Sequence, residues 1–157
     1  MKEPSQLLLR FEEALATLET HHLESPLPGR NPSAFRELVP DLERHSEAGE
    51  PRCQAALATT LAFGLACATE SEFREQYDAL ISRATALWAE AAMQLFWPAF
   101  DNLATCGVGP EADLARTIAR TLEAESPALV GSQGGLPVYG PGFMQEACAR
   151  FARTRAA

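Results

Sequence analysis

This sequence of 157 residues contains no long run of hydrophobic residues. A helix needs about 20 consecutive apolar residues to cross a bilayer, and no stretch approaches that length. The N-terminus begins Met-Lys-Glu-Pro and lacks the short apolar core that a signal peptide carries. We therefore expect a cytoplasmic protein with no membrane partner.

Basic residues are scarce relative to acidic ones. The chain has 13 Lys and Arg against 21 Asp and Glu, which gives a formal net charge of −8. Because such a surface repels phosphate groups, we expect no nucleic-acid partner. Long-range attraction would instead speed the association of this chain with a basic protein.

Residues that usually carry catalysis or bind metal ions are few and unfavourably spaced. His21 and His22 are adjacent, so their side chains leave a helix in different directions, and His45 stands alone. No C-x-x-C pair is formed by the four cysteines, which are Cys53, Cys67, Cys106 and Cys148. Residues 131–135, Gly-Ser-Gln-Gly-Gly, match no phosphate-binding motif. We expect no metal, no cofactor and no enzymatic activity, and we interpret the cysteines as small buried hydrophobes.

Hydrophobic residues make up 46% of the chain and recur at steps of three and four, the spacing of one helix face. Glycines and prolines divide this pattern into segments. Gly49 suits the end of one helix, and Pro51 and Pro110 suit the first turns of others. Ser71 is the expected N-cap of the longest helix. The expected helices span residues 5–22, 33–48, 51–64, 71–95, 99–106, 110–125 and 143–155.

The chain is expected to form one all-α domain over residues 1–157. Its parts are an N-terminal helix within 1–25, a helical core over 33–125, a loop rich in glycine and proline over 126–142, and a C-terminal helix over 143–155. No segment has a convincing strand pattern, and residues 136–139 come nearest to one. Three aromatic residues are expected in the core: Trp88, Phe96 and Trp97.

Two parts of the chain repeat each other at a separation of 46 positions. The matching positions are Gly49 with Leu95, Cys53 with Ala99, Leu57 with Leu103 and Ala58 with Ala104. Cys53-Gln54-x-x-Leu57-Ala58, the later Gly64 and the pair Gly107-Val108 resemble the pattern of Sel1-like repeats, a branch of the tetratricopeptide-type helical repeats. The resemblance covers roughly residues 40–125. It departs from the family in its long spacing and in Leu95, which replaces a turn glycine.

The resemblance implies a short array of antiparallel helical hairpins with about six to eight helices. In such arrays each hairpin leaves an apolar face that the next hairpin covers. A non-repetitive helical bundle is the alternative fold.

The resemblance also implies a non-catalytic protein-binding module. Together with the acidic composition, it suggests a dedicated inhibitor of a basic partner, such as the immunity protein that neutralises a bacterial secreted toxin. One alternative is a small-molecule-binding or regulatory domain with a pocket between helices. Another is a homo-oligomer formed through the end helices.

Two surfaces are candidates for contacting a partner. The first is an acidic group at the start of helix 71–95, although compensation of the helix dipole would explain it as well. Its members are Glu70, Glu72, Glu75 and Asp78. The second is the loop over 126–142, since loops of this length are often either functional or disordered. The candidate residues there are Gln133, Leu136, Val138 and Tyr139.

If Leu57 and Leu103 are equivalent core positions, replacing either with alanine should lower the free energy of unfolding by about 2–5 kcal/mol, because each change leaves a cavity. Urea unfolding of the two variants measures the loss. Losses below about 0.5 kcal/mol at both positions would contradict the repeat assignment.

Overall fold

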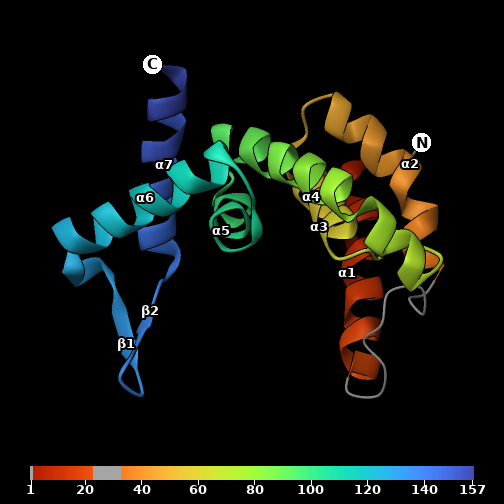
Figure 1. The fold of residues 1–157 in the computed structure, drawn as a ribbon, viewed down its shortest axis with the longest axis horizontal. Helices are drawn as coiled ribbons and strands as arrows, with labels where there is room; N and C mark the ends of the chain where they lie inside the picture. The colour runs from red at the N-terminus through yellow and green to blue at the C-terminus, as the bar shows by residue number, and fades with distance from the viewer. Residues whose placement is uncertain (1, 23–32) are drawn as a thin grey trace.

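The computed structural model describes residues 2–22 and 33–157, with the side chains of residues 19–22 excepted. These residues form the predicted all-α fold, with seven α-helices, and in addition one small two-stranded sheet (Figure 1). The helices are α1 (Pro4–His22), α2 (Ala34–Glu47), α3 (Pro51–Ala62), α4 (Glu70–Met93), α5 (Trp97–Cys106), α6 (Pro110–Glu125) and α7 (Pro141–Ala156). A 3₁₀ turn, η1 (Pro127–Leu129), precedes the strands β1 (Gly131–Gln133) and β2 (Leu136–Val138).

The helices are stacked in chain order, which confirms the predicted helical array. Each helix packs against the next, and contacts also join α1 to α3, α4 to α6, and both α4 and α5 to α7. Figure 1 shows α4 running from the middle of the molecule to the end of the long axis that holds α1 to α3, with α6, α7 and the sheet at the other end. None of the described helices is long and apolar enough to span a membrane.

The core follows this stack as one continuous cluster. Leu57 on α3 and Leu103 on α5 are both fully buried, as their matching positions in the sequence predicted. Trp88 on α4 is fully buried too, whereas Phe96 and Trp97 are only partly buried and pack against the edge of the cluster.

Most of the predicted helix boundaries agree with the structure. Pro51 and Pro110 lie in the first turns of α3 and α6. The N-cap of α4 is Thr69 rather than the predicted Ser71. The Thr69 hydroxyl accepts a hydrogen bond of 3.0 Å from the backbone N–H of Glu72, and this bond satisfies an amide that the helix leaves unpaired.

The two matching turns, at Gly49 and Leu95, have the same backbone geometry. Both residues follow a helix with a left-handed conformation, at φ values of 91° and 67°. In both turns the next amide donates to the carbonyl five positions earlier, from Glu50 to His45 and from Phe96 to Ala91. This pattern is the Schellman motif, which usually places glycine at the left-handed position. Leu95 therefore adopts a strained conformation, and its side chain is 62% exposed.

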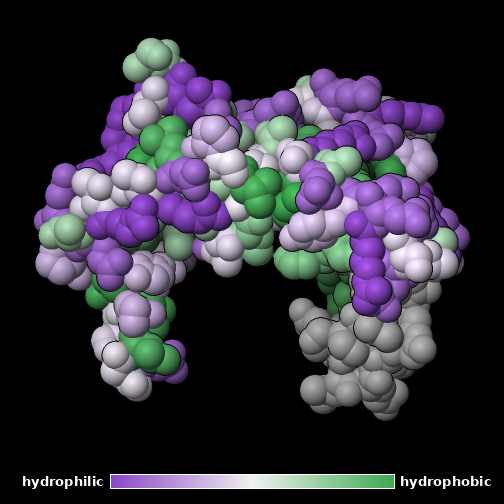
Figure 2. Space-filling model, viewed as in Figure 1, coloured by the Kyte–Doolittle hydropathy of each residue, from purple (hydrophilic) through white to green (hydrophobic). Residues whose placement is uncertain are grey.

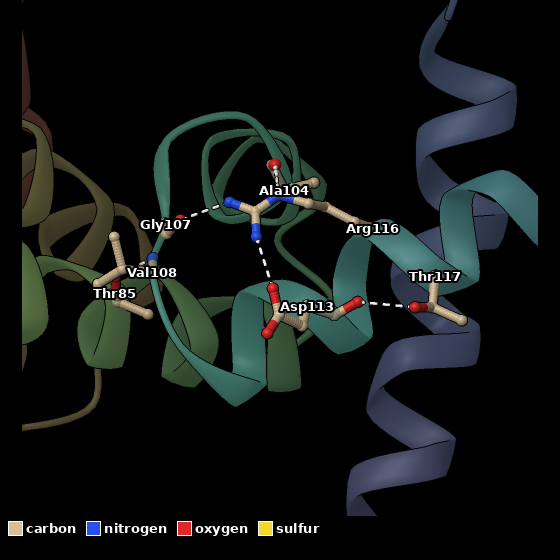
Figure 3. A network of polar contacts seen from close by, with 7 residues as sticks. All are labelled: Thr85, Ala104, Gly107, Val108, Asp113, Arg116 and Thr117. Carbon is tan, nitrogen blue, oxygen red and sulfur yellow. Dashed lines mark hydrogen bonds and ion pairs between the residues drawn. The ribbon is translucent and has the colours of Figure 1, made fainter.

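Arg116 on α6 holds the C-terminal end of α5 (Figure 3). Its guanidinium donates to the backbone oxygens of Ala104, at 2.9 Å, and of Gly107, and it forms an ion pair with Asp113 at 3.0 Å. The last carbonyls of a helix have no partner within the helix, and a cation there also interacts favourably with the helix dipole. Arg116 thus fixes the angle between α5 and α6.

The expected loop over 126–142 is wrong in part, because it contains an antiparallel β-hairpin. Gln133 pairs with Leu136, and the turn between them is Gly134–Gly135, with φ values of 60° and 81°. Positive φ at both central residues defines the tight turn that matches the twist of a hairpin, and glycine adopts it without strain.

Replacing Leu95 with glycine should raise the free energy of unfolding by about 1 kcal/mol, because glycine removes the strain of the left-handed conformation. Thermal and urea unfolding measure the change. The matched control is Gly49→Ala, which should lower stability by a similar amount, since the added Cβ would meet no atom within 4 Å and only the backbone conformation is penalised. A destabilised Leu95→Gly variant would contradict the strain at this turn.

Candidate partner-binding surfaces

Two of the four acidic residues at the start of α4 have a structural role. Glu70 forms an ion pair with Arg74 one turn later. The Glu72 carboxylate accepts a hydrogen bond of 2.8 Å from the backbone N–H of Ala68, just before the helix. Both carboxylates also lie in the first turn of α4, where negative charge is favourable.

The other two, Glu75 and Asp78, are exposed and form no ion pair within the described residues. They belong to a strongly acidic half of the chain, since residues 33–95 contain ten acidic and five basic residues. Residues 96–157 contain six acidic and five basic residues. In Figure 2, hydrophilic residues predominate over α2 and the start of α4. We call the exposed surface formed by α2 and the start of α4, which includes Glu75 and Asp78, the acidic face.

The β-hairpin projects from the opposite end of the molecule and exposes apolar residues (Figures 1 and 2). The side chain of Leu136 is 70% exposed, and Val138 and Gln133 are exposed as well. Tyr139 has a structural role at the base of the hairpin. Its hydroxyl donates to Glu123 at 3.0 Å, an interaction that raises the pKa of Tyr139, and its ring contacts Phe143.

The structure does not bring the two predicted groups of site residues together. The start of α4, which carries Glu75 and Asp78, lies near the end that holds α2, whereas β2, which carries Leu136 and Val138, lies at the far end of the long axis (Figure 1). They are two separate surfaces.

A polar crevice of about 450 Å³, which the sequence did not predict, lies between three helices. Residues of α2 and α4 line its sides, and residues of α3 lie between them. We call it the α2–α4 crevice; its polar lining residues are Glu43, Ser46, Glu47, Gln54, Arg83 and Glu90. Its volume falls within the range of small-ligand sites.

Gln54 is the polar centre of this crevice, although only 3% of the residue is exposed. Its amide nitrogen donates to the Ser46 backbone oxygen and to a Glu90 carboxylate oxygen, both at 3.2 Å. Its amide oxygen accepts from Gln94 at 3.0 Å. Gln54 therefore fixes one oxygen of Glu90 in place. A glutamine among the small and apolar residues of α3 was the available sequence signal for such a site.

A second cavity, of about 470 Å³, lies between α6 and α7. Its charged side chains already have partners, since Arg150 pairs with Glu125 at 2.7 Å and with Glu146 at 3.3 Å. The hydroxyls of Thr117 and Thr154 donate to carbonyls of their own helices. This cavity offers a ligand few unpaired polar groups.

No group of three or more metal-binding side chains occurs among the described residues. His45 makes a hydrogen bond of 2.8 Å between Nε2 and the backbone oxygen of Lys2, and the side chains of His21 and His22 lie outside the described part of the chain. All four cysteines are free. Burial raises the pKa of Cys53 and of Cys148 to about 11, which keeps both thiols protonated at neutral pH.

Comparisons with family models, with curated proteins and with solved structures found no match for this chain. The resemblance to Sel1-like repeats therefore stays a prediction that rests on the motifs of the sequence.

Thiol alkylation should distinguish the cysteines. A pKa of about 11 leaves roughly 0.1% thiolate at pH 8 for Cys53 and Cys148, whereas Cys106 is partly exposed. Iodoacetamide should therefore modify Cys106 first in the folded protein, as followed by peptide mass spectrometry. In urea all four should react at similar rates. Preferential modification of Cys53 in the folded protein would contradict this assignment and indicate an activated nucleophile.

Proposed function

We propose that this chain is a non-catalytic protein-binding module that captures a basic protein through its acidic face. The observation that supports this most directly is the presence on α4 of two exposed carboxylates, Glu75 and Asp78, that form no ion pair within the described residues. Helices held rigidly in a stack present such charges in a fixed pattern, and charge complementarity gives both a fast encounter and selectivity.

The narrower form of the proposal is a dedicated inhibitor, such as the immunity protein that neutralises a bacterial secreted toxin. An inhibitor of this kind needs tight and rapid capture rather than chemistry. The net charge of −8 supports rapid capture of a basic target, because electrostatic steering raises association rates. The hairpin would add a second, apolar contact through Leu136 and Val138.

The proposed absence of catalysis is supported by the state of the potential nucleophiles. Catalytic thiols are activated by a lowered pKa, whereas every cysteine here has a raised one. The only described histidine side chain, His45, is engaged with the backbone of Lys2.

A direct test is affinity capture from the source cell with the folded protein as bait, followed by mass spectrometry. We expect one dominant protein with a basic pI, whose recovery falls as the salt concentration rises. A partner encoded beside this gene would support the inhibitor role. Recovery of no stable protein partner would contradict the proposal.

Reversing the charge of Glu75 and Asp78 to lysine should slow association with the captured partner by about tenfold at low salt, because the acidic face steers the encounter. Surface plasmon resonance measures the association rate. The matched control is the double replacement of Glu12 and Glu13 with lysine, since these exposed α1 residues give the same change in net charge on another surface. Equal slowing by both double variants would show that net charge, rather than this face, governs binding.

A further inference from the structure

Leu95 is the most exposed of the described large hydrophobic residues outside the β-hairpin. It also has a left-handed backbone conformation, at a φ of 67°, which the Cβ of a leucine disfavours. The fold does not need leucine at this position, since Gly49 makes the matching turn without a side chain. Leu95 therefore costs the fold free energy, and strained residues of this kind are typically kept where they serve function.

An apolar groove of about 270 Å³ lies next to Leu95, between α1 and α3. We call it the α1–α3 groove; its apolar lining residues are Leu8, Phe11, Leu15, Ala55, Ala56 and Phe96. Several of these residues are only partly buried, so the groove opens to solvent. Phe96 directly follows Leu95 in the chain, but Leu95 is not part of the lining. The exposed leucine thus lies beside the groove of its own chain without filling it.

The two charged residues that line the groove have opposite signs. Glu12 of α1 is exposed and forms no ion pair or hydrogen bond through its side chain within the described residues. Arg52 of α3 donates through Nε to Glu50 at 2.9 Å, and its two Nη groups have no partner in the described part of the chain. A two-fold axis between Glu12 and Arg52 would place each carboxylate opposite a guanidinium of the other copy, so this surface is complementary in charge to itself.

We propose that the chain forms a two-fold dimer in which Leu95 of each copy enters the α1–α3 groove of the other. A projecting side chain and an apolar groove next to each other on one surface are the arrangement that a self-complementary interface needs. Burial of Leu95 and Phe96 against the apolar lining stabilises the dimer, and this gain offsets the cost of the left-handed turn. Glu12 of each copy lies opposite Arg52 of the other and sets the orientation.

The charge of the chain restricts where two copies can meet. Each copy has a net charge of −8, so an acidic part of the surface repels the same part of a second copy. The α1–α3 groove avoids this repulsion, because its lining contains one acidic and one basic residue. No residue of α2 or α4 lines it, so the dimer leaves the acidic face free to bind a different protein. The inference is therefore independent of the proposed function.

Sedimentation equilibrium of the full chain tests the dimer. Because the interface is small, we expect a weak dimer, whose average mass rises from that of one chain towards that of two between about 10 µM and 1 mM. Leu95→Asp should weaken self-association at least tenfold, since it would bury an unpaired charge in the apolar groove. The matched control is Leu136→Asp, the same change at an exposed leucine of the β-hairpin, which should leave self-association unchanged.

Two further variants test the projecting residue and the groove separately. Leu95→Gly removes the side chain and relieves the left-handed turn, so it should abolish the rise in mass while it raises the free energy of unfolding, measured at a concentration where the monomer predominates. Loss of the dimer in this variant cannot result from unfolding. Ala55→Leu fills the groove from α3 and should also abolish the dimer, although Leu95 is still present.

An average mass that stays at that of one chain up to 1 mM would overturn the inference. A dimer that both Leu95→Gly and Ala55→Leu leave intact would overturn it too, because another surface would then join the copies. The same holds if the chain alone is monomeric and Leu95→Gly reduces the recovery of a captured protein, since that protein would occupy the groove. None of these results decides whether the acidic face binds a basic protein, which the Glu75 and Asp78 variants test.

Discussion

The close packing of α3 against its neighbours is the constraint on which the rest of the structure depends. At 12 residues α3 is too short to be stable as an isolated helix, so tertiary contacts must hold it. It packs against α1, α2 and α4, and eight of its residues are buried. Most of these are alanine, threonine or cysteine, and small side chains let the neighbouring helices approach closely. The floor of the α2–α4 crevice, with Gln54 and Leu57, is a consequence of this arrangement.

The connections between helices also determine how the helices are arranged. At Gly49 and Leu95 the chain leaves a helix through the same left-handed turn, and Leu95 adopts it despite its side chain. At the end of α5, the Arg116 side chain takes the place of such a turn, because it donates hydrogen bonds to the backbone oxygens there. Because each connection fixes the direction of the next helix, the exposed carboxylates of α2 and α4 have fixed relative positions, which is the property a binding surface needs.

The sequence predicted the fold better than the site, for physical reasons. Helix boundaries are local, so the sequence predicts the helix ends at Pro51, Pro110 and Gly49 correctly. The N-cap at Thr69 also has a local signal, the glutamate three residues later. The hairpin was also local, since Gly134–Gly135 between two short segments is a recognised turn signal. The crevice was not predictable, because its lining residues come from three helices and only packing brings them together. Of the four acidic candidates, only structure could show that Glu70 and Glu72 serve the helix start, while Glu75 and Asp78 form no ion pair within the described part of the chain.

The shared turn at Gly49 and Leu95 has a consequence for how such a chain could change in length. The segment 49–94 begins at one left-handed turn and stops just before the other, so its two ends present the same backbone geometry to whatever follows. A copy of this segment inserted at Leu95 would join the chain at both ends through the same left-handed turn, without a new type of connection. Duplication of this 46-residue segment would therefore leave the caps of the flanking helices unchanged.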